Sequence, residues 1–281
     1  MGKFDGILIA TDLDGTLLTD SKKVSDTDKS AIEYFMSEGG YFTICSGRSV
    51  MGVDSILGQI TPNAPIITYN GAVIYDAKKK ETLWETFLGE DSLEVIDFVE
   101  NSFPFSGIEV CTDNGFAVSR SNARLKEQMK WENVPAIEIH HSKSPRPWRK
   151  VLFIQEADET DTVRNALASS PFAEKFNFMK SAPWYYEMLP ENASKGLALL
   201  RVAEMLGIDK SRTVGAGDNE NDLSLVELAG VGIGVKNASP EILSAADYIT
   251  ASDNNSSPMA EIIKSIENLE FKGLILNTNV T

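Results

Sequence analysis

Two aspartates stand two residues apart near the start of the chain, in the stretch LIATDLDGT at residues 8–16. Asp12 and Asp14 follow an apolar run, residues 4–10, that is typical of a short buried strand. In open α/β sheets, ligands bind just outside the carboxyl ends of the strands. Two carboxylates held close together repel each other unless a cation or a shared proton offsets the repulsion. The pair therefore indicates either a metal site or an ordinary solvated loop, since Asp, Gly and Thr are also common turn residues.

A second acidic segment, GAGDNEND at residues 215–222, follows another apolar run at residues 213–216. Its glycines permit sharp turns, and Asp218 and Asp222 add two carboxylates at the end of another expected strand. The two acidic segments together supply enough oxygen ligands for a hard octahedral cation. The sequence shows no His/Cys cluster near them, which argues against zinc. The residue types therefore predict Mg²⁺ at this place.

Three further residues have the chemistry of a phosphate site. Ser46 and Gly47 offer a hydroxyl and a backbone N–H group in a loop that opens a helix, which is a natural position for an anion. Lys195 stands at the start of an expected helix, where a cation is unfavourable to the helix dipole. This position favours a role in binding an external anion, but a solvated surface lysine fits the same pattern.

The composition limits the classes of molecule that the chain can bind. The chain has 26 basic and 41 acidic residues, a formal charge of −15 that opposes docking on nucleic acid or on an anionic membrane surface. We find no apolar run long enough to span a bilayer and no secretory signal pattern. Cys45 and Cys111 fit a reducing compartment and provide no disulfide framework. We therefore expect a cytoplasmic protein that acts on a small ligand, and no protein partner is indicated.

The elements that must position these residues form an alternating pattern at both ends of the chain, which predicts βαβ units and a parallel sheet. A length of 281 residues favours two domains. The expected strands are residues 4–10, 41–45, 65–69, 213–216 and 231–235, and the expected helices are residues 25–38, 50–57, 194–206 and 223–228. Polar and glycine residues follow two of these strands, namely Ser46-Gly47-Arg48 and Asn70-Gly71.

The pattern changes between residues 82 and 189, which are rich in aromatic residues and strand-like runs. We interpret this segment as an inserted domain, with residues 1–81 and 190–281 forming the first domain. The two histidines of the chain, His140 and His141, lie in a polar stretch of the insertion. They are expected to be exposed loop residues, and substrate contact is the alternative.

Four ordered motifs resemble those of the haloacid dehalogenase superfamily. They are DLDGT at 12–16, SGR at 46–48, Lys195, and GDNEND at 217–222. The further patterns NGA at 70–72 and MLPENASKG at 188–196, with the large insertion between them, resemble the Cof-type subfamily. The resemblance covers nearly the whole chain. It implies a Rossmann-like, doubly wound parallel α/β sheet with an inserted α/β cap domain of the large, type IIB kind.

The resemblance also implies roles for the acidic residues. Asp12 would attack phosphorus and become an aspartyl phosphate, while Asp14 would protonate the leaving oxygen and later activate water. Mg²⁺ would be bound by the Asp12 carboxylate, the Asp14 backbone carbonyl and Asp218. Asp222 would orient Lys195 or a water molecule on the metal.

The remaining carried-over positions concern the phosphate and the rest of the substrate. The phosphoryl oxygens would be held by side chains and backbone amides, namely those of Leu13, Ser46, Gly47, Lys195 and Asn221. Arg48 would reach the substrate or pair on the surface, and Asn70 is a second candidate for substrate contact.

Three functions of different class fit these expectations. The first is a Mg²⁺-dependent phosphatase of a small phosphorylated metabolite, such as a sugar phosphate, a nucleotide or a cofactor phosphate. The second is a phosphotransferase, for instance a sugar phosphomutase, that passes the same aspartyl phosphate to a hydroxyl group. The third is a non-enzymatic phosphorylation switch, which the acid role of Asp14 and the large insertion disfavour.

Overall fold

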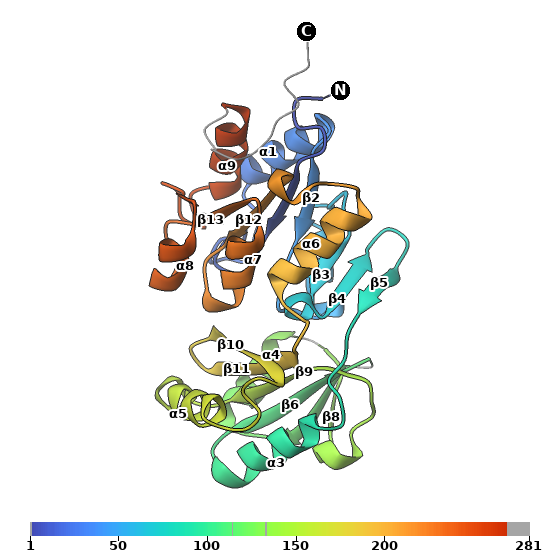
Figure 1. Cartoon of the computed structure of the whole chain (residues 1–281), viewed down its shortest axis with the longest axis vertical. Coiled ribbons are helices and arrows are strands. Elements are labelled where there is room, and N and C mark those ends of the chain that lie inside the picture. The colour runs from blue at the N-terminus through green and yellow to red at the C-terminus, as the bar shows by residue number, and fades with distance from the viewer. Residues whose placement is uncertain (1, 114, 133, 269–281) are drawn as a thin grey trace. The chain divides into compact units, whose positions relative to one another are not determined.

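The computed structural model describes residues 2–113, 115–132 and 134–268, and the chain divides into two compact units (Figure 1). We call residues 1–84 with 194–281 the core unit and residues 85–193 the inserted unit. Each unit has its own sheet and its own apolar core. The predicted mixed α/β fold with a parallel sheet and an insertion is confirmed.

The sheet of the core unit is parallel, and within the described residues its strand order is β14-β13-β12-β1-β2. Strand β1 (Leu8–Thr11) lies between β12 and β2, and it is fully buried because helices cover both faces of the sheet. The other four strands are β2 (Tyr41–Ile44), β12 (Thr213–Gly217), β13 (Val231–Gly234) and β14 (Tyr248–Ile249).

Helices cover both faces of this sheet because alternate strand residues point to opposite sides. Ile9 packs in an apolar cluster with residues of α1 (Asp26–Ser37) and α9 (Pro258–Glu267). Leu8 and Ala10 pack in a second cluster with α6 (Lys195–Met205) and α7 (Leu223–Leu228). A further helix of the core unit is α8 (Pro240–Ala245).

Two predicted elements of the core unit are partly wrong. The first strand was expected from residue 4, but it begins only at Leu8 because residues 3–6 form a turn in which Gly6 has a φ of +73°. The helix expected over residues 50–57 is instead a 3₁₀ turn, Met51–Val53, followed by the single-turn α2 (Asp54–Leu57). The spacing of apolar residues along the sequence does not distinguish these tighter turns from a continuous helix.

A small sheet extends the core unit beyond β2. Its strands are β3 (Ile66–Thr68), β4 (Val73–Asp76) and β5 (Glu81–Glu85), and β3 and β4 are antiparallel. A single parallel bridge between Cys45 and Ile67 links β3 to the end of β2. This bridge brings the loops that follow β2 and β3 to the same edge.

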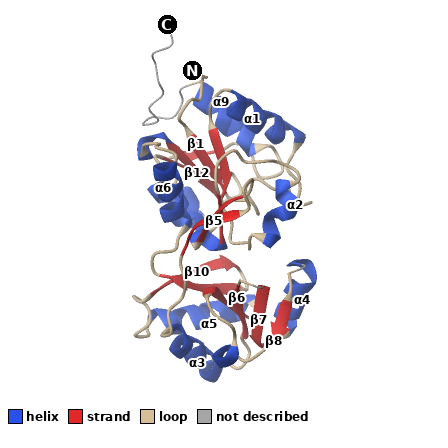
Figure 2. Cartoon of the chain, turned by 90° about the vertical axis from the view of Figure 1, so that its right-hand side faces the viewer, coloured by secondary structure: helices blue, strands red, loops and turns tan. Residues whose placement is uncertain are grey.

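The inserted unit has a mixed sheet of order β10-β11-β9-β6-β7-β8 within the described residues. The helices α3 (Ser92–Ser102) and α5 (Ala157–Ala168) lie on one face of this sheet, as Figure 2 shows. Apolar side chains of the sheet pack against both helices. The third helix is α4 (Ala123–Glu132). The strands are β6 (Gly107–Thr112), β7 (Gly115–Arg120), β8 (Ala136–Glu138), β9 (Trp148–Ile154), β10 (Phe176–Ala182) and β11 (Tyr185–Pro190).

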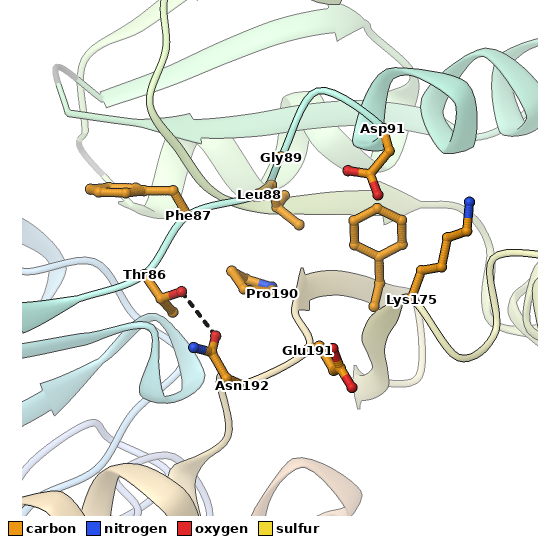
Figure 3. A pocket seen from close by; sticks show the side chains of 10 residues that line it. Thr86, Phe87, Leu88, Gly89, Asp91, Lys175, Pro190, Glu191 and Asn192 are labelled. Carbon is orange, nitrogen blue, oxygen red and sulfur yellow. Dashed lines mark hydrogen bonds between the residues drawn. The ribbon is translucent and has the colours of Figure 1, made fainter.

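The two ends of the inserted unit lie together around an open cavity of about 280 Å³ (Figure 3). The Thr86 hydroxyl donates a hydrogen bond of 2.9 Å to the Asn192 side chain, which ties the two ends to each other. The charged residues that line the cavity are of mixed sign, namely Asp91, Lys175 and Glu191. The described part of the chain contains no helix that is long and apolar enough to cross a membrane.

Candidate active site

The two acidic segments meet at the carboxyl ends of β1 and β12. Asp12 is the first residue after β1, and its backbone N–H donates a hydrogen bond of 2.9 Å to the carbonyl of Ala216 in β12. This bond continues the parallel ladder by one residue and fixes the position of the Asp12 backbone. The Asp12 side chain is buried, with a residue exposure of 6%.

Lys195 joins the two acidic segments through its ammonium group. Its Nζ lies 2.5 Å from an oxygen of Asp12 and 2.5 Å from an oxygen of Asp222. The Ser194 hydroxyl caps the helix that Lys195 begins, accepting a hydrogen bond from the Leu197 N–H. Lys195 is fully buried, so the alternative of a solvated surface lysine is wrong. The sequence did not reveal this because its two carboxylate partners are 183 and 27 residues away.

The ionisation of these three groups is interdependent. Burial lowers the pKa of Lys195, but the charges of Asp12 and Asp222 outweigh it and raise that pKa above its ordinary value. Burial and repulsion from Asp222 raise the pKa of Asp12 well above its ordinary value, and Lys195 opposes this shift. One cation therefore serves two buried carboxylates, and the cluster has a deficit of positive charge.

Asp218 adds a third carboxylate. Ligand oxygens of Asp12, Asp218 and Asp222 all lie within 4.8 Å of one another. Burial and the charge of Asp222 raise the pKa of Asp218 to about 7, although the Thr16 hydroxyl donates to it at 2.9 Å. A site built of oxygen donors with excess negative charge fits a hard divalent cation, which would offset the repulsion.

Gly15 allows the first loop to approach Asp218 closely. Its φ is +90°, a conformation that residues with a side chain rarely adopt. A Cβ atom at this position would lie 2.4 Å from a carboxylate oxygen of Asp218. The glycine of the DLDGT motif is therefore required both by the turn and by the space around the carboxylates.

Asp14 occupies a different environment from Asp12. Arg48 forms a two-pronged ion pair with it, with both N···O distances at 2.7 Å, and the Lys22 ammonium lies 2.8 Å from one oxygen. Burial raises the pKa of Asp14, but the hydrogen bonds and charges of Arg48 and Lys22 outweigh it, so the pKa lies below its ordinary value. Arg48 therefore pairs with Asp14, a candidate catalytic carboxylate.

The spacing of Asp12 and Asp14 does not continue the alternation of a strand, in which residues two apart point to the same side. Strand β1 ends at Thr11, and the chain turns around Asp14. Leu13 is fully buried, and its carbonyl accepts from the Leu18 N–H at 2.8 Å. The turn sequence sets the directions of the two carboxylates.

The loops after β2 and β3 interlock. Ser46 is buried, and its hydroxyl accepts a hydrogen bond of 3.2 Å from the Arg48 N–H. Asn70 is fully buried in a left-handed conformation, with a φ of +53°, and its N–H donates to the Ser46 carbonyl at 3.0 Å. A Cβ atom on Gly47 would lie 3.0 Å from the Asn70 amide group.

Asn221 reaches the same place from the second acidic segment. Its side-chain amide donates a hydrogen bond of 3.1 Å to the Asn70 side chain. The Asp222 carboxylate accepts from the backbone N–H groups of Asp218 and Asn219 at 3.0 and 3.1 Å, which closes the turn after β12. Asn70 thus links the loop after β2 to the loop after β12.

The structure brings all eleven sequence-predicted positions to this edge of the core unit, and it adds Lys22 and Thr16. Thr16 was part of the DLDGT motif, but no role was expected for it. Lys22 was missed because nothing in its neighbourhood distinguishes it from an ordinary surface lysine. Its φ of +59° is the local feature that turns it toward Asp14.

The chain is similar to known proteins over most of its length. A family described as haloacid dehalogenase-like hydrolases matches residues 9–263. The Bacillus subtilis protein named "Putative phosphatase YxeH" is 32% identical over 259 residues, which are 88% of this chain and 93% of that protein. The B. subtilis "5-amino-6-(5-phospho-D-ribitylamino)uracil phosphatase YitU" is 26% identical over 262 residues, 92% of this chain and 96% of that protein.

A solved structure supports the same assignment. The crystal structure of a haloacid dehalogenase-like hydrolase from Bacteroides thetaiotaomicron aligns with a TM-score of 0.78 and 25% identity. The alignment covers 92% of this chain and 99% of that protein. The resemblance found in the sequence motifs is therefore confirmed, and the chain belongs to the haloacid dehalogenase-like hydrolases, in the Cof-type subfamily.

Proposed function

We propose that this chain is a Mg²⁺-dependent phosphatase that hydrolyses a small phosphorylated metabolite through an aspartyl phosphate on Asp12. The observation that carries this proposal is the buried Asp12–Lys195–Asp222 cluster beside Asp218 at the carboxyl edge of the sheet. A nucleophilic carboxylate can approach a phosphate dianion only where cations offset the repulsion between them. The phosphatase names of the relatives support the same reaction class.

Asp12 attacks phosphorus with one carboxylate oxygen, and the bond from phosphorus to the leaving oxygen breaks. The Lys195 ammonium holds the Asp12 carboxylate in place and offsets the negative charge of the phosphoryl group. Asp14 donates a proton to the leaving oxygen and then removes one from the water that hydrolyses the aspartyl phosphate. Asp222 keeps Lys195 in position through its ion pair.

The family generally uses a divalent metal, and we assign Mg²⁺ to this chain because the donors are oxygen atoms. The Asp12 and Asp218 carboxylates and the Asp14 backbone carbonyl would hold it. When bound, it would neutralise charge on the phosphoryl oxygens and draw them toward the nucleophile.

Hydrogen-bond donors around the Ser46 loop complete the phosphate site. The Ser46 hydroxyl, the backbone amides of Leu13 and Gly47, and the Asn221 side chain would donate to phosphoryl oxygens. Asn70 holds Asn221 in place through the hydrogen bond between their side chains. Asp14 must part from at least one of its cationic partners, Arg48 or Lys22, before it can take up a proton.

A panel of phosphate esters tests the reaction. The full chain with Mg²⁺ is incubated with sugar phosphates, nucleotides, cofactor phosphates and 5-amino-6-(5-phospho-D-ribitylamino)uracil, and released phosphate is measured. The last compound is included because the name of a relative specifies it. Release of phosphate supports the phosphatase. Transfer to an added hydroxyl compound without release identifies a phosphotransferase, and stable phosphorylation without turnover identifies a switch.

We expect Mg²⁺ to bind about tenfold more weakly at pH 6 than at pH 8. The metal-free Asp218 has a pKa of about 7, so it is mostly protonated at pH 6 and mostly ionised at pH 8. Its ordinary pKa is near 4, so the folded, metal-free protein binds a proton between pH 4 and 7 that the unfolded chain does not. The stability of the metal-free protein should therefore fall as the pH rises through this range.

Calorimetric titration with Mg²⁺ at the two pH values, together with thermal unfolding, measures both effects. The thermal stabilisation by Mg²⁺ should be larger at pH 8. In Asp218→Asn, which has no proton to lose at residue 218, the affinity should be lower and should change less between the two pH values. Equal Mg²⁺ affinity of the unmodified chain at pH 6 and pH 8 would contradict this coupling.

We expect Ser46→Ala to lower kcat/KM roughly 10-fold to 100-fold for every ester of the panel, because it removes one donor to a charged group. The matched control is Ser49→Ala, which removes a buried hydroxyl that accepts a hydrogen bond from the Gly52 N–H in the same loop. The steady-state rates of both variants are measured with three unrelated esters. A loss confined to one ester, or an equal loss in the control variant, would show that Ser46 does not bind the common phosphoryl group.

A further inference from the structure

The inserted unit contains a group of histidine and carboxylate side chains on α3 and at the start of the 3₁₀ turn His141–Lys143. The group consists of His140, His141, Asp97 and Glu100, and we call it the histidine cluster. His140 and His141 are the only histidines of the chain. Ligand atoms of Glu100 and both histidines all lie within 4.8 Å of one another.

Each histidine already faces a carboxylate of α3. The His141 Nε2 atom lies 2.8 Å from Asp97 Oδ1, and the His140 Nε2 atom lies 3.3 Å from Glu100 Oε2. Asp97 and Glu100 are three residues apart on the helix, so they lie on one face of it. The two imidazole rings are 4.1 Å apart between their centres, which brings both Nε2 atoms toward the same helix face.

The other nitrogen of each ring has its own partner. His141 Nδ1 lies 2.9 Å from the Ser119 hydroxyl, and His140 Nδ1 lies 2.9 Å from the Ser142 hydroxyl. The Ser119 hydroxyl can accept a proton from His141 Nδ1, and the lone pair of His141 Nε2 is then available to a cation. His140 Nδ1 also accepts a hydrogen bond of 3.3 Å from the Ser142 backbone N–H, so His140 gives up this bond when its Nε2 binds an ion. Metal-binding histidines commonly donate their second ring N–H group in this way. His141 is 1% exposed in its side chain, so its ring is held in place by packing.

We propose that the histidine cluster is a binding site for a transition-metal ion, Zn²⁺ or a similar ion, separate from the acidic site of the core unit. Two imidazole nitrogens and the Glu100 carboxylate form a three-ligand donor set that suits Zn²⁺ and is unlike the all-oxygen set around Asp12. A tetrahedral ion about 2.1 Å from each donor holds neighbouring donors about 3.4 Å apart. The distance of 3.3 Å between His140 Nε2 and Glu100 Oε2 already matches this spacing, and the ligand atoms of all three residues lie within 4.8 Å of one another. His141 Nε2 would exchange its contact with Asp97 for the ion.

The site is open to solvent on one side. The side chains of Asp97, His140 and Glu100 are 60%, 50% and 24% exposed, so an ion can enter without unfolding the unit. A bound ion would tie the turn that carries both histidines to α3. It should therefore raise the thermal stability of the protein, because it binds the folded form only.

Titration of the full chain with ZnCl₂ tests the site, with Mg²⁺ in excess to load the acidic site of the core unit. The protein is labelled with ¹⁵N, and the ring nitrogens are followed by NMR. The two histidines of the chain provide four assignable ring nitrogens. We expect one equivalent of Zn²⁺ to shift both Nε2 signals and to raise the thermal midpoint. If neither histidine responds to one equivalent, the proposal is wrong.

Variants on exposed positions separate the site from a structural effect. His140→Ala should lose one bound equivalent of Zn²⁺ and the gain in thermal midpoint, and Glu100→Gln should weaken binding by roughly tenfold or more. The matched control, Glu94→Gln, changes an exposed carboxylate of the same helix outside the cluster and should bind Zn²⁺ like the unmodified chain. Unchanged Zn²⁺ stoichiometry and affinity in His140→Ala would overturn the proposal.

Discussion

The variant Asp12→Asn should lose turnover by on the order of 10⁴-fold or more, the scale of loss expected when a covalent nucleophile is removed. An amide nitrogen or oxygen cannot form the acyl phosphate that the proposed reaction requires. The loss should be the same for esters with good and poor leaving groups, because no ester can react without the nucleophile. Rates of phosphate release at saturating substrate and Mg²⁺ measure it.

The structure predicts that this variant still folds. Removing the Asp12 charge leaves Lys195 paired with Asp222, and it removes the repulsion between the two buried carboxylates. We therefore expect the thermal midpoint to change by no more than about 4 °C. Asp26→Asn, at an exposed position in the first turn of α1, is the matched control and should retain full activity. An Asp12→Asn protein that keeps most of its turnover would exclude Asp12 as the nucleophile.

The core sheet could be predicted because its local signals agree with its tertiary structure. Short apolar runs followed by Gly, Ser, Asn and Asp mark buried parallel strands and the loops at their carboxyl ends. The helix over Leu223–Leu228 matches its predicted bounds, and those predicted over residues 25–38 and 194–206 differ by one residue at each end. The helix predicted over residues 50–57 is wrong, because two tight turns replace it. Phe4 and Ile7 give residues 4–7 the composition of a strand, although residues 3–6 form a turn.

The contacts inside the site could not be predicted from local sequence. Lys195 and Asp12 are far apart in the chain, and only the parallel order of β1 and β12 and the packing of α6 bring them together. The same holds for the pairing of Asp14 with Arg48 and Lys22. Motif resemblance named most of the participating residues, but it did not indicate which cation neutralises which carboxylate.

The burial of the histidines could be predicted only in part. The polar residues around them predict an exposed loop, and this is correct for His140, whose side chain is half exposed. It is wrong for His141, which is buried because its ring lies between Ser119 of β7 and Asp97 of α3. A buried polar ring is compatible with folding only where both nitrogens find partners. Such partners come from other elements and have no signature in the neighbouring sequence.

Asp14→Ala should slow the hydrolysis of alkyl phosphates by roughly 10²–10⁴-fold, the usual contribution of general acid–base catalysis. Alkoxide leaving groups need a proton as the bond to phosphorus breaks, and Asp14 is the proposed donor. A p-nitrophenolate leaving group needs little protonation. With p-nitrophenyl phosphate, formation of the aspartyl phosphate should therefore be less impaired than its hydrolysis, which still needs a base to activate water.

This difference between the two steps predicts an initial burst of p-nitrophenol release. Asp14→Ala should release p-nitrophenol rapidly, up to about one equivalent per protein, and then continue at a slow steady rate while phosphorylated Asp12 accumulates. Rapid mixing with the aryl ester, followed by mass measurement of the quenched protein, observes both events. Asp14→Asn is the matched variant, because it keeps hydrogen-bonding atoms near Arg48 and Lys22 but cannot transfer the proton. If aryl and alkyl esters slow equally and no burst occurs, Asp14 positions the site through its ion pairs and does not move the proton.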